Sequence, residues 1–301
     1  MRTRSPLQCF LLISIAVWSL SARPSLSETA NPAAAQPVGA KHFLWRVTNA
    51  PQPVYLLGSY HALRGSDYPL GHEIDQAIGQ CKRFVFEFDM KHSEEGNYSK
   101  KMRDQSHYPA GITLKQKVRS ETYAYAQKIA KTRASTYNDM KPWAIAFFMM
   151  SHPYYYNVYS YWGVEGYVMR KAGASAEFGG LETADEHVRV LSDMRDIEGE
   201  VFLLQAFVYA DANAANFGKE ITAYKRGDSQ ALAAFDAQRD REAPFITWRI
   251  IDHRNAQWIP RIEQEMKSGK STMIVVGARH LCGAHNVISM LQAKGYSLEQ
   301  L

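Results

Sequence analysis

Two copies of one short motif, near opposite ends of the chain, constrain its fold more than any other feature. The units Gly58–His61 and Gly277–His280 both read Gly-x-x-His, and they follow the apolar runs Val54–Leu57 and Met273–Val276. Apolar runs of this length are typical of buried strands, and a terminal glycine lets the backbone turn sharply. Ligand sites in open α/β sheets lie at the carboxyl ends of strands. The repeat therefore predicts that the two histidines meet at one edge of a sheet.

The rest of the pattern predicts an α/β fold. Apolar spacing predicts strands at 42–48, 54–57, 84–89, 175–182, 272–276 and 296–298, and helices at 69–81, 114–131, 140–150, within 184–226, and at 243–267. The polar segment 91–111 is expected to be a loop. Strands flank a mainly helical middle, so we expect a single domain with a mixed β-sheet built from two related halves and a helical insertion.

The first residues have the pattern of a secretory signal peptide. Arg2 and Arg4 precede an apolar run from Cys9 to Leu20, and small residues follow. The run is shorter than the ~20 residues that a membrane-spanning helix needs, which disfavours an uncleaved anchor. We expect a signal peptide over 1–27, a disordered lead-in over 28–40, and one folded domain over 41–301. Cleavage is expected between Ala22 and Ala35.

Charge, length and cysteine content narrow the class of protein. The formal net charge is +5, and no Lys/Arg cluster is interleaved with aromatic residues, so nucleic acid is not an expected partner. About 260 residues remain after the lead-in, enough for a substantial core. Only Cys81 and Cys282 remain in the mature chain. In an oxidising compartment they could pair, or they could both be core residues.

Two carboxylates stand at the ends of predicted strands. Glu87 lies within the apolar run 84–89, and Glu182 ends the run before a helix. A buried carboxylate needs a partner, so Glu87 is a metal ligand, a general base, or one half of an ion pair with an arginine. Together with His61 and His280 these glutamates form a plausible metal set, because imidazole and carboxylate suit divalent first-row ions.

Other catalytic motifs are absent from the sequence. There is no His-Glu-x-x-His, no Cys-x-x-Cys pair, no P-loop and no Gly-x-Gly-x-x-Gly. Ser59 lies beside His61, but without a Gly-x-Ser-x-Gly elbow a serine hydrolase is not favoured.

An ordered series of motifs resembles the TraB/GumN family, which includes the animal TIKI metalloproteases. The resemblance runs from about Phe43 to Leu301. It is carried by these blocks: Phe43–Arg46, Tyr55–His61, Phe86–Asp89, Gly163–Glu165, Leu181–Thr183, Tyr224–Asp228, Arg254–Asn255, Val276–Gly283, and Leu291 with Gly295–Tyr296. The series is far more specific than one Gly-x-x-His.

The resemblance implies a metal-dependent peptidase chemistry. By motif, His61 and His280 correspond to the paired histidines and Glu87 to the acidic partner, with Glu182 as a further metal ligand of less defined role. The implied cofactor is a divalent ion: manganese, cobalt or zinc. Related folds include erythromycin esterase-like hydrolases and a haem-binding lipoprotein.

Some positions depart from the family pattern or admit two interpretations. Glu165 stands where the family usually has Asp after Gly-Val, and Arg279 stands where Gly is common. Arg279 could bind a substrate carboxylate or pair with an acidic neighbour. Arg254 and Asn255 could bind substrate or orient a ligand. The tyrosine-rich segment 154–162 could line a cleft or pack internally.

These observations favour an exported metal-dependent hydrolase, most consistent with a peptidase. His61, His280 and Glu87 are its expected catalytic residues, and a peptide or small molecule is its expected substrate. It is expected in the periplasm or secreted, with no stable membrane insertion after signal cleavage. The rival functions are a non-catalytic haem-, metal- or peptide-binding protein and an accessory protein in exopolysaccharide production. The sequence leaves the oligomeric state open.

Overall fold

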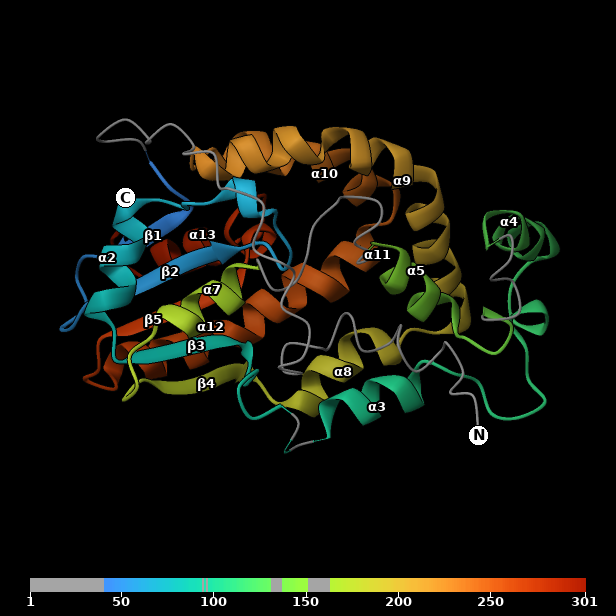
Figure 1. The fold of residues 1–301 in the computed structure, drawn as a ribbon, viewed down its shortest axis with the longest axis horizontal. Helices are drawn as coiled ribbons and strands as arrows, with labels where there is room; N and C mark the ends of the chain where they lie inside the picture. Colours follow the sequence, from blue (N-terminus) through green and yellow to red (C-terminus); the bar gives the residue numbers. More distant parts are fainter. Residues whose placement is uncertain (1–40, 94, 96, 131–136, 151–162) are drawn as a thin grey trace. The chain divides into compact units, whose positions relative to one another are not determined.

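A computed structural model describes residues 41–93, 95, 97–130, 137–150 and 163–301 (Figure 1). The predicted signal peptide and lead-in, and the tyrosine-rich segment 154–162, lie outside the described residues. The described residues divide into two compact units. A helical unit comprises residues 93–150 and 184–215, and a sheet unit comprises residues 41–92, 163–183 and 216–301.

A mixed sheet, as expected, forms the centre of the sheet unit. The order of its six strands is β4-β3-β5-β2-β1-β6. Their bounds are β1 Leu44–Val47, β2 Val54–Ser59, β3 Arg83–Phe88, β4 Glu177–Glu182, β5 Thr272–Gly277 and β6 Leu298–Gln300. Four neighbours, β4, β3, β5 and β2, are parallel, and β1 is antiparallel to both β2 and β6. The α/β class with one mixed sheet is confirmed, whereas the relation between two halves stays a prediction.

The two Gly-x-x-His units lie on neighbouring strands. β2 pairs with β5 in parallel, with Gly58 opposite Val276 and Ser59 opposite Gly277. Both strands therefore end at the same edge, so the expected adjacency of the two units is confirmed. Gly58 is required by close packing, because a Cβ at this position would clash with Cδ1 of Phe43.

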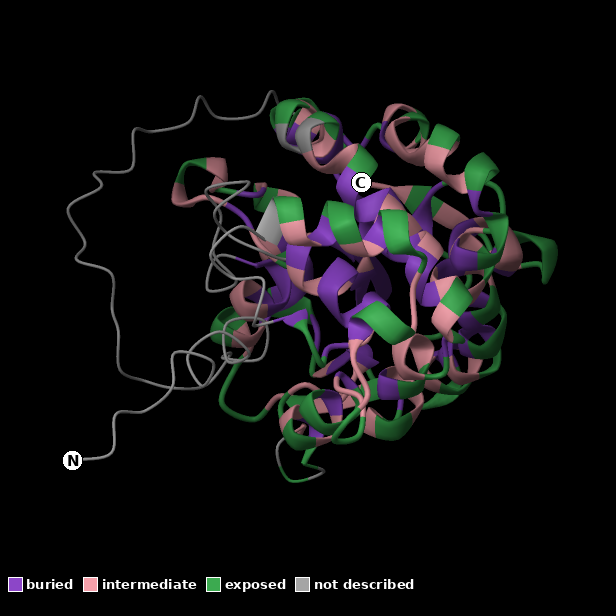
Figure 2. Ribbon diagram, turned by 90° about the vertical axis from the view of Figure 1, so that its right-hand side faces the viewer, coloured by how far each residue is buried: buried purple, intermediate pink, exposed green. Residues whose placement is uncertain are grey.

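Helices cover both faces of the sheet. Figure 1 shows α2 (His72–Gln80) and α7 (Val164–Lys171) on one face and α12 (His253–Lys267) and α13 (Val287–Ala293) on the other. The strands supply the apolar core, and β2 is buried at every position. In Figure 2 buried residues gather in the strands and on the inner sides of the helices, with exposed residues on the outer sides.

Three helices of the sheet unit were absent from the sequence prediction: α7, α10 (Ser229–Glu242) and α13. α7 and α13 are short, and α10 buries only Leu232, so none carries a strong apolar stripe. The long helix expected over 243–267 is present in three segments. It runs as α11 (Pro244–Thr247), a π-helical turn at Trp248–Asp252, and α12.

The helical unit contains the predicted helical insertion and one helix that the prediction missed. Its elements are α3 Tyr98–Gln105, a 3-10 turn at Leu114–Gln116, α4 Ser120–Ala130, α5 Pro142–Met150, α8 Ala184–Ser192 and the first part of α9 Asp196–Lys225. The expected loop over 91–111 is wrong at α3. Tyr98 and Met102, four residues apart, are its two buried residues, and the surrounding polar sequence hides this narrow stripe.

Cys81 and Cys282 are both buried and carry free thiols. Of the two sequence alternatives, the structure supports core residues. Burial raises the pKa of both thiols to about 12, so they are protonated at neutral pH.

Candidate functional site

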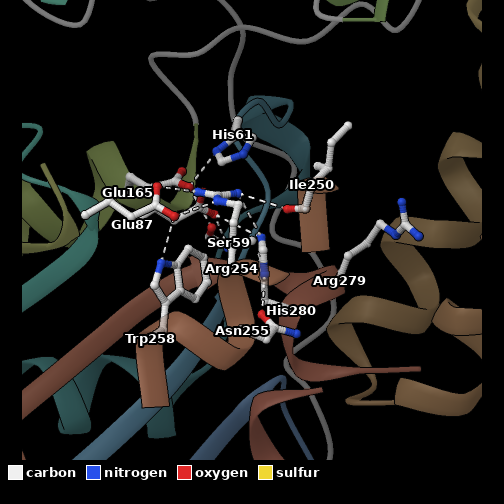
Figure 3. Close-up of polar contacts among 12 residues, drawn as sticks. Ser59, His61, Glu87, Glu165, Ile250, Arg254, Asn255, Trp258, Arg279 and His280 are labelled. Carbon is white, nitrogen blue, oxygen red and sulfur yellow. Dashed lines mark hydrogen bonds and ion pairs between the residues drawn. The ribbon is translucent and has the colours of Figure 1, made fainter. Parts of the chain in front are cut away.

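His61 is held by a buried carboxylate at the carboxyl edge of the sheet. Its Nδ1 donates a hydrogen bond to Oε1 of Glu165 over 2.7 Å, and Oγ of Ser59 donates to the same oxygen over 2.6 Å (Figure 3). The His61 side chain is 73% exposed, whereas that of Glu165 is 7% exposed. A fixed acceptor at Nδ1 orients the ring and leaves Nε2 for chemistry.

Local backbone contacts put Glu165 in this position. The N–H of Val164, the first residue of α7, donates to the carbonyl of Tyr60 over 3.0 Å. This bond attaches the start of α7 to the loop that carries His61. On the other side, the Tyr224 hydroxyl donates to the carbonyl of Gly58 over 2.8 Å and fixes the end of β2.

The pair has opposite pKa shifts. The Glu165 charge raises the pKa of His61 above its ordinary value. Desolvation opposes protonation of the ring, but the charge of Glu165 and its hydrogen bond to the ring outweigh it. Burial would raise the pKa of Glu165, but the charge of His61 and the hydrogen bonds from His61 and Ser59 outweigh it and lower that pKa. At neutral pH we infer an imidazolium–carboxylate pair.

His280 is in a contrasting environment. It is 3% exposed, and its Nδ1 lies 2.6 Å from Oδ1 of Asn255. The Asn255 amide nitrogen donates to the carbonyl of His285, so Oδ1 is the acceptor and His280 donates through Nδ1–H. Burial lowers the pKa of His280 to about 3. The ring is therefore neutral at pH 7, with its lone pair on Nε2.

Arg254 lies at the centre of the buried part of the site. Its Nε and Nη2 donate to the two oxygens of Glu182 over 2.8 and 3.0 Å, and Nη2 also donates to Oε2 of Glu87 over 2.6 Å. Its Nη1 lies 3.3 Å from Nε2 of His280. One guanidinium thus joins two carboxylates and an imidazole from three strand ends.

The π-helical turn and a tryptophan complete the surroundings of Arg254. Within this turn the carbonyl of Ile250 accepts a hydrogen bond from Nη1 over 3.2 Å. The guanidinium carbon lies 4.6 Å from the centre of the Trp258 ring, whose Nε1 donates to Glu182 over 2.9 Å. Such π-turns often occur at functional sites.

The side chains of Glu87, His280 and His61, which the sequence predicts as site residues, lie around Gly277. Its N–H donates to Oε1 of Glu87 over 2.8 Å. A Cβ at this position would lie 3.2 Å from Oε1 of Glu87, 3.5 Å from Cδ2 of His280 and 4.0 Å from Nε2 of His61. The glycine leaves room between these side chains, and a larger residue would press on Glu87.

Comparison with known protein families gives one match. A model of the TraB/PrgY/gumN family matches residues 43–300. The chain belongs to this family. No curated protein and no solved structure gives a significant match. The match spans both Gly-x-x-His units, which β2 and β5 bring to the same edge of the sheet.

The residues predicted to bind substrate have other contacts. Arg279 donates to both carboxylate oxygens of Asp240 over 2.7 and 2.9 Å and lies 2.6 Å from Asp236. Figure 3 shows its side chain pointing away from the rest of the site. The structure thus supports pairing with acidic neighbours, one of the two sequence alternatives. Arg254 and Asn255 are both at most 6% exposed and hold protein groups, so a role in orienting the site suits them better.

The predicted metal ligands do not fit one ion in this arrangement. His61, His280 and Glu87 have suitable donor atoms, but Arg254 pairs with Glu87 and points an N–H at Nε2 of His280. The same guanidinium takes both oxygens of Glu182. Within the described residues, no three His, Cys, Asp or Glu side chains are grouped so that they could hold a metal.

In the sequence, Glu165 stands out only as a departure from the family pattern, with no role attached to it. Trp258 was not singled out at all. The signal for Glu165 was a carboxylate just after Gly163-Val164 at the start of a helix, but only the fold brings it to His61.

No helix of the described residues is long and apolar enough to cross a membrane.

Proposed function

We propose that this protein is a hydrolase, with peptides as the substrate class, in which Glu87 and His61 act as general base and general acid. Glu87 would take a proton from the attacking water. The His61 imidazolium would give a proton from Nε2 to the leaving group. Two titratable groups in such different environments are the arrangement that acid–base hydrolysis needs.

The position of these groups around Gly277 carries this proposal. Oε1 of Glu87 and Nε2 of His61 face the same small space beside the glycine, at 3.2 and 4.0 Å from its virtual Cβ. A substrate carbonyl beside Gly277 would be within reach of both groups. The exposed His61 ring gives access from solvent, and the buried Glu165 behind it keeps the ring oriented and charged.

The remaining residues of the site would act by positioning the two catalytic residues, Glu87 and His61. Arg254 and the N–H of Gly277 each occupy one oxygen of Glu87 and so fix its carboxylate. His280 is nearly inaccessible, and we assign it to positioning Arg254 through Nε2. This differs from the catalytic role that the sequence suggests for His280.

A metal-dependent form of the same hydrolase is the second candidate. Both histidines have Nδ1 held by an acceptor, as metal-binding imidazoles usually do. Manganese, cobalt or zinc at Nε2 of His61 and His280 would require Arg254 to move. Export to the periplasm or beyond also stays a proposal, supported by Arg2, Arg4 and the apolar run after them.

The test is a peptide-library cleavage assay with purified mature protein, run with EDTA and, separately, with manganese, cobalt or zinc. We expect cleavage that persists in EDTA and is lost in Glu87→Gln and His61→Ala. Cleavage only with added metal would favour the second candidate. Tight uptake of haem or peptide without any product would support a binding protein instead. His72→Ala, which changes an exposed histidine of α2, is the matched control.

A further inference from the structure

The buried part of the site holds two carboxylates whose negative charge must be compensated whether or not the protein is a hydrolase. Glu87 and Glu182 are each 8% exposed and lie near one another at the ends of β3 and β4. Buried carboxylates require a compensating positive charge. A metal ion or a basic side chain can supply it.

Arg254 supplies that charge with every donor it has. A guanidinium has five N–H groups. They meet five acceptors: two oxygens of Glu182, one of Glu87, the carbonyl of Ile250 and Nε2 of His280. The paired bonds to Glu182 have the two-pronged geometry that guanidinium and carboxylate prefer. The side chain is 7% exposed, so the site is built around it.

The position of the guanidinium also conflicts with a metal ion. An ion bound through Nε2 of His280 would need the lone pair toward which Nη1 of Arg254 points. It would also share Glu87 with a fixed positive charge 2.6 Å from that carboxylate. The metal ion and the guanidinium would both be positive, and two positive charges bound to the same buried carboxylate repel each other strongly.

We infer that Arg254 is the resident cation of this site: it occupies the place of a divalent metal ion, neutralises Glu87 and Glu182, and holds Nε2 of His280. Removing the guanidinium would leave two carboxylates and an imidazole around an empty space. This group has the ligand chemistry of a divalent-metal site. The wild-type chain therefore binds no divalent ion here, and loss of Arg254 creates a site that does.

The experiment is a Co²⁺ titration of the EDTA-treated mature protein, followed by visible absorption and by melting temperature. We expect no Co²⁺ spectrum and no shift in melting temperature for the wild type. Arg254→Ala should melt lower than the wild type without metal, and Co²⁺ should give it a visible spectrum and raise its melting temperature. Neither readout uses activity, so failure of the hydrolase proposal would not affect this one.

Arg83→Ala is the matched control. Arg83 also lies between two glutamates, with Nε 2.6 Å from Glu265 and Nη1 3.8 Å from Glu177, but without an imidazole. We expect no Co²⁺ spectrum for this variant. Tight Co²⁺ binding by the wild type that is lost in His61→Ala or His280→Ala would overturn the inference. A folded Arg254→Ala protein with no affinity for Co²⁺ would do the same. If Arg254→Ala does not fold even with Co²⁺, the wild-type titration alone decides.

Discussion

Nδ1 of His61 lies 2.7 Å from Oε1 of Glu165, which joins an exposed imidazole on the loop after β2 to a buried carboxylate at the start of α7. His280, in the 3-10 turn that follows the neighbouring strand β5, is instead buried against the neutral amide of Asn255. Two copies of one motif thus give two histidines with pKa values shifted in opposite directions. Because their protonation differs, we assign acid catalysis to His61 and the positioning of Arg254 to His280.

His61→Ala should abolish most activity with little effect on stability. General acid catalysis contributes about 10²- to 10⁴-fold, so we expect a loss of that order in kcat/KM. The side chain is 73% exposed, so the loss of its ion pair with Glu165 should lower the free energy of unfolding by about 1 kcal/mol or less. Urea denaturation and steady-state kinetics measure the two effects. A large loss of stability with unchanged activity would make His61 a structural residue.

Glu165→Gln should change the pH dependence of activity. The Glu165 charge raises the pKa of His61, so the acid form of wild-type His61 persists above the ordinary value of about 6.5. Without that charge the imidazolium loses its proton at lower pH, and activity should begin to fall at lower pH than in the wild type. Profiles of kcat/KM against pH for both proteins measure this. If kcat/KM fell at the same alkaline pH in the wild type and in Glu165→Gln, His61 would not be the general acid.

The same interaction links the stability of the protein to pH. A histidine whose pKa is raised on folding contributes stability below its unfolded pKa of about 6.5, and this contribution is lost as pH rises through the folded pKa. The exposure of His61 makes the effect small, because solvent screens the pair. Melting curves of wild type and Glu165→Gln should therefore converge as pH rises above neutrality. A gap that widens with pH would be inconsistent with this pairing.

His280→Gln should reduce acid sensitivity. Burial lowers the pKa of His280 to about 3, so the unfolded chain takes up this proton more readily than the folded one. Stability from this group is present above about pH 6.5 and is lost as pH falls toward the folded pKa. Unfolding free energy between pH 4 and 7 should fall less steeply in the variant than in the wild type. His72→Gln, at an exposed position, should keep the wild-type slope.

Gly277→Ala should affect activity more than stability. The added methyl would lie 3.2 Å from Oε1 of Glu87 and 3.5 Å from the His280 ring, so one of these groups must shift. A displacement of about 1 Å at reacting groups can reduce a rate by ~10²-fold, and we expect a loss of that order in kcat. Gly173→Ala is the control, because no atom lies within 4 Å of its virtual Cβ. Equal activity of the two variants would show that Gly277 does not border the reacting groups.

The meeting of the two Gly-x-x-His units at one sheet edge could be predicted from the sequence because it depends on a local pattern. Four buried residues followed by Gly-x-x-His specify a strand and its turn, and two such strands in one sheet place the histidines together. The predicted partnership of Glu87 with an arginine, left as one of three alternatives, is also what the structure contains. Local pattern cannot choose among them, because Arg254 is 167 residues away in the chain.

The roles of Glu165, Arg279 and Asn255 depend on such distant contacts. Glu165 reaches His61 only because Val164 is bonded to the carbonyl of Tyr60. Arg279 turns outward because Asp236 and Asp240 stand one helical turn apart on α10. The short helices that the sequence analysis missed, α7 above all, bring some of these partners to the site, and they lack the long apolar stripe that pattern analysis detects.

The protonation states of the two histidines are the most direct test of the proposed site. An NMR pH titration of protein labelled with ¹⁵N in its histidine rings reads both, with His61→Ala and His280→Gln to assign the signals. We expect His61 to titrate above its ordinary pKa of about 6.5. We expect His280 to remain neutral between about pH 5 and 8 with its proton on Nδ1. Two rings that titrate together near the ordinary value, or a His280 protonated at neutral pH, would contradict the division of roles proposed for this site.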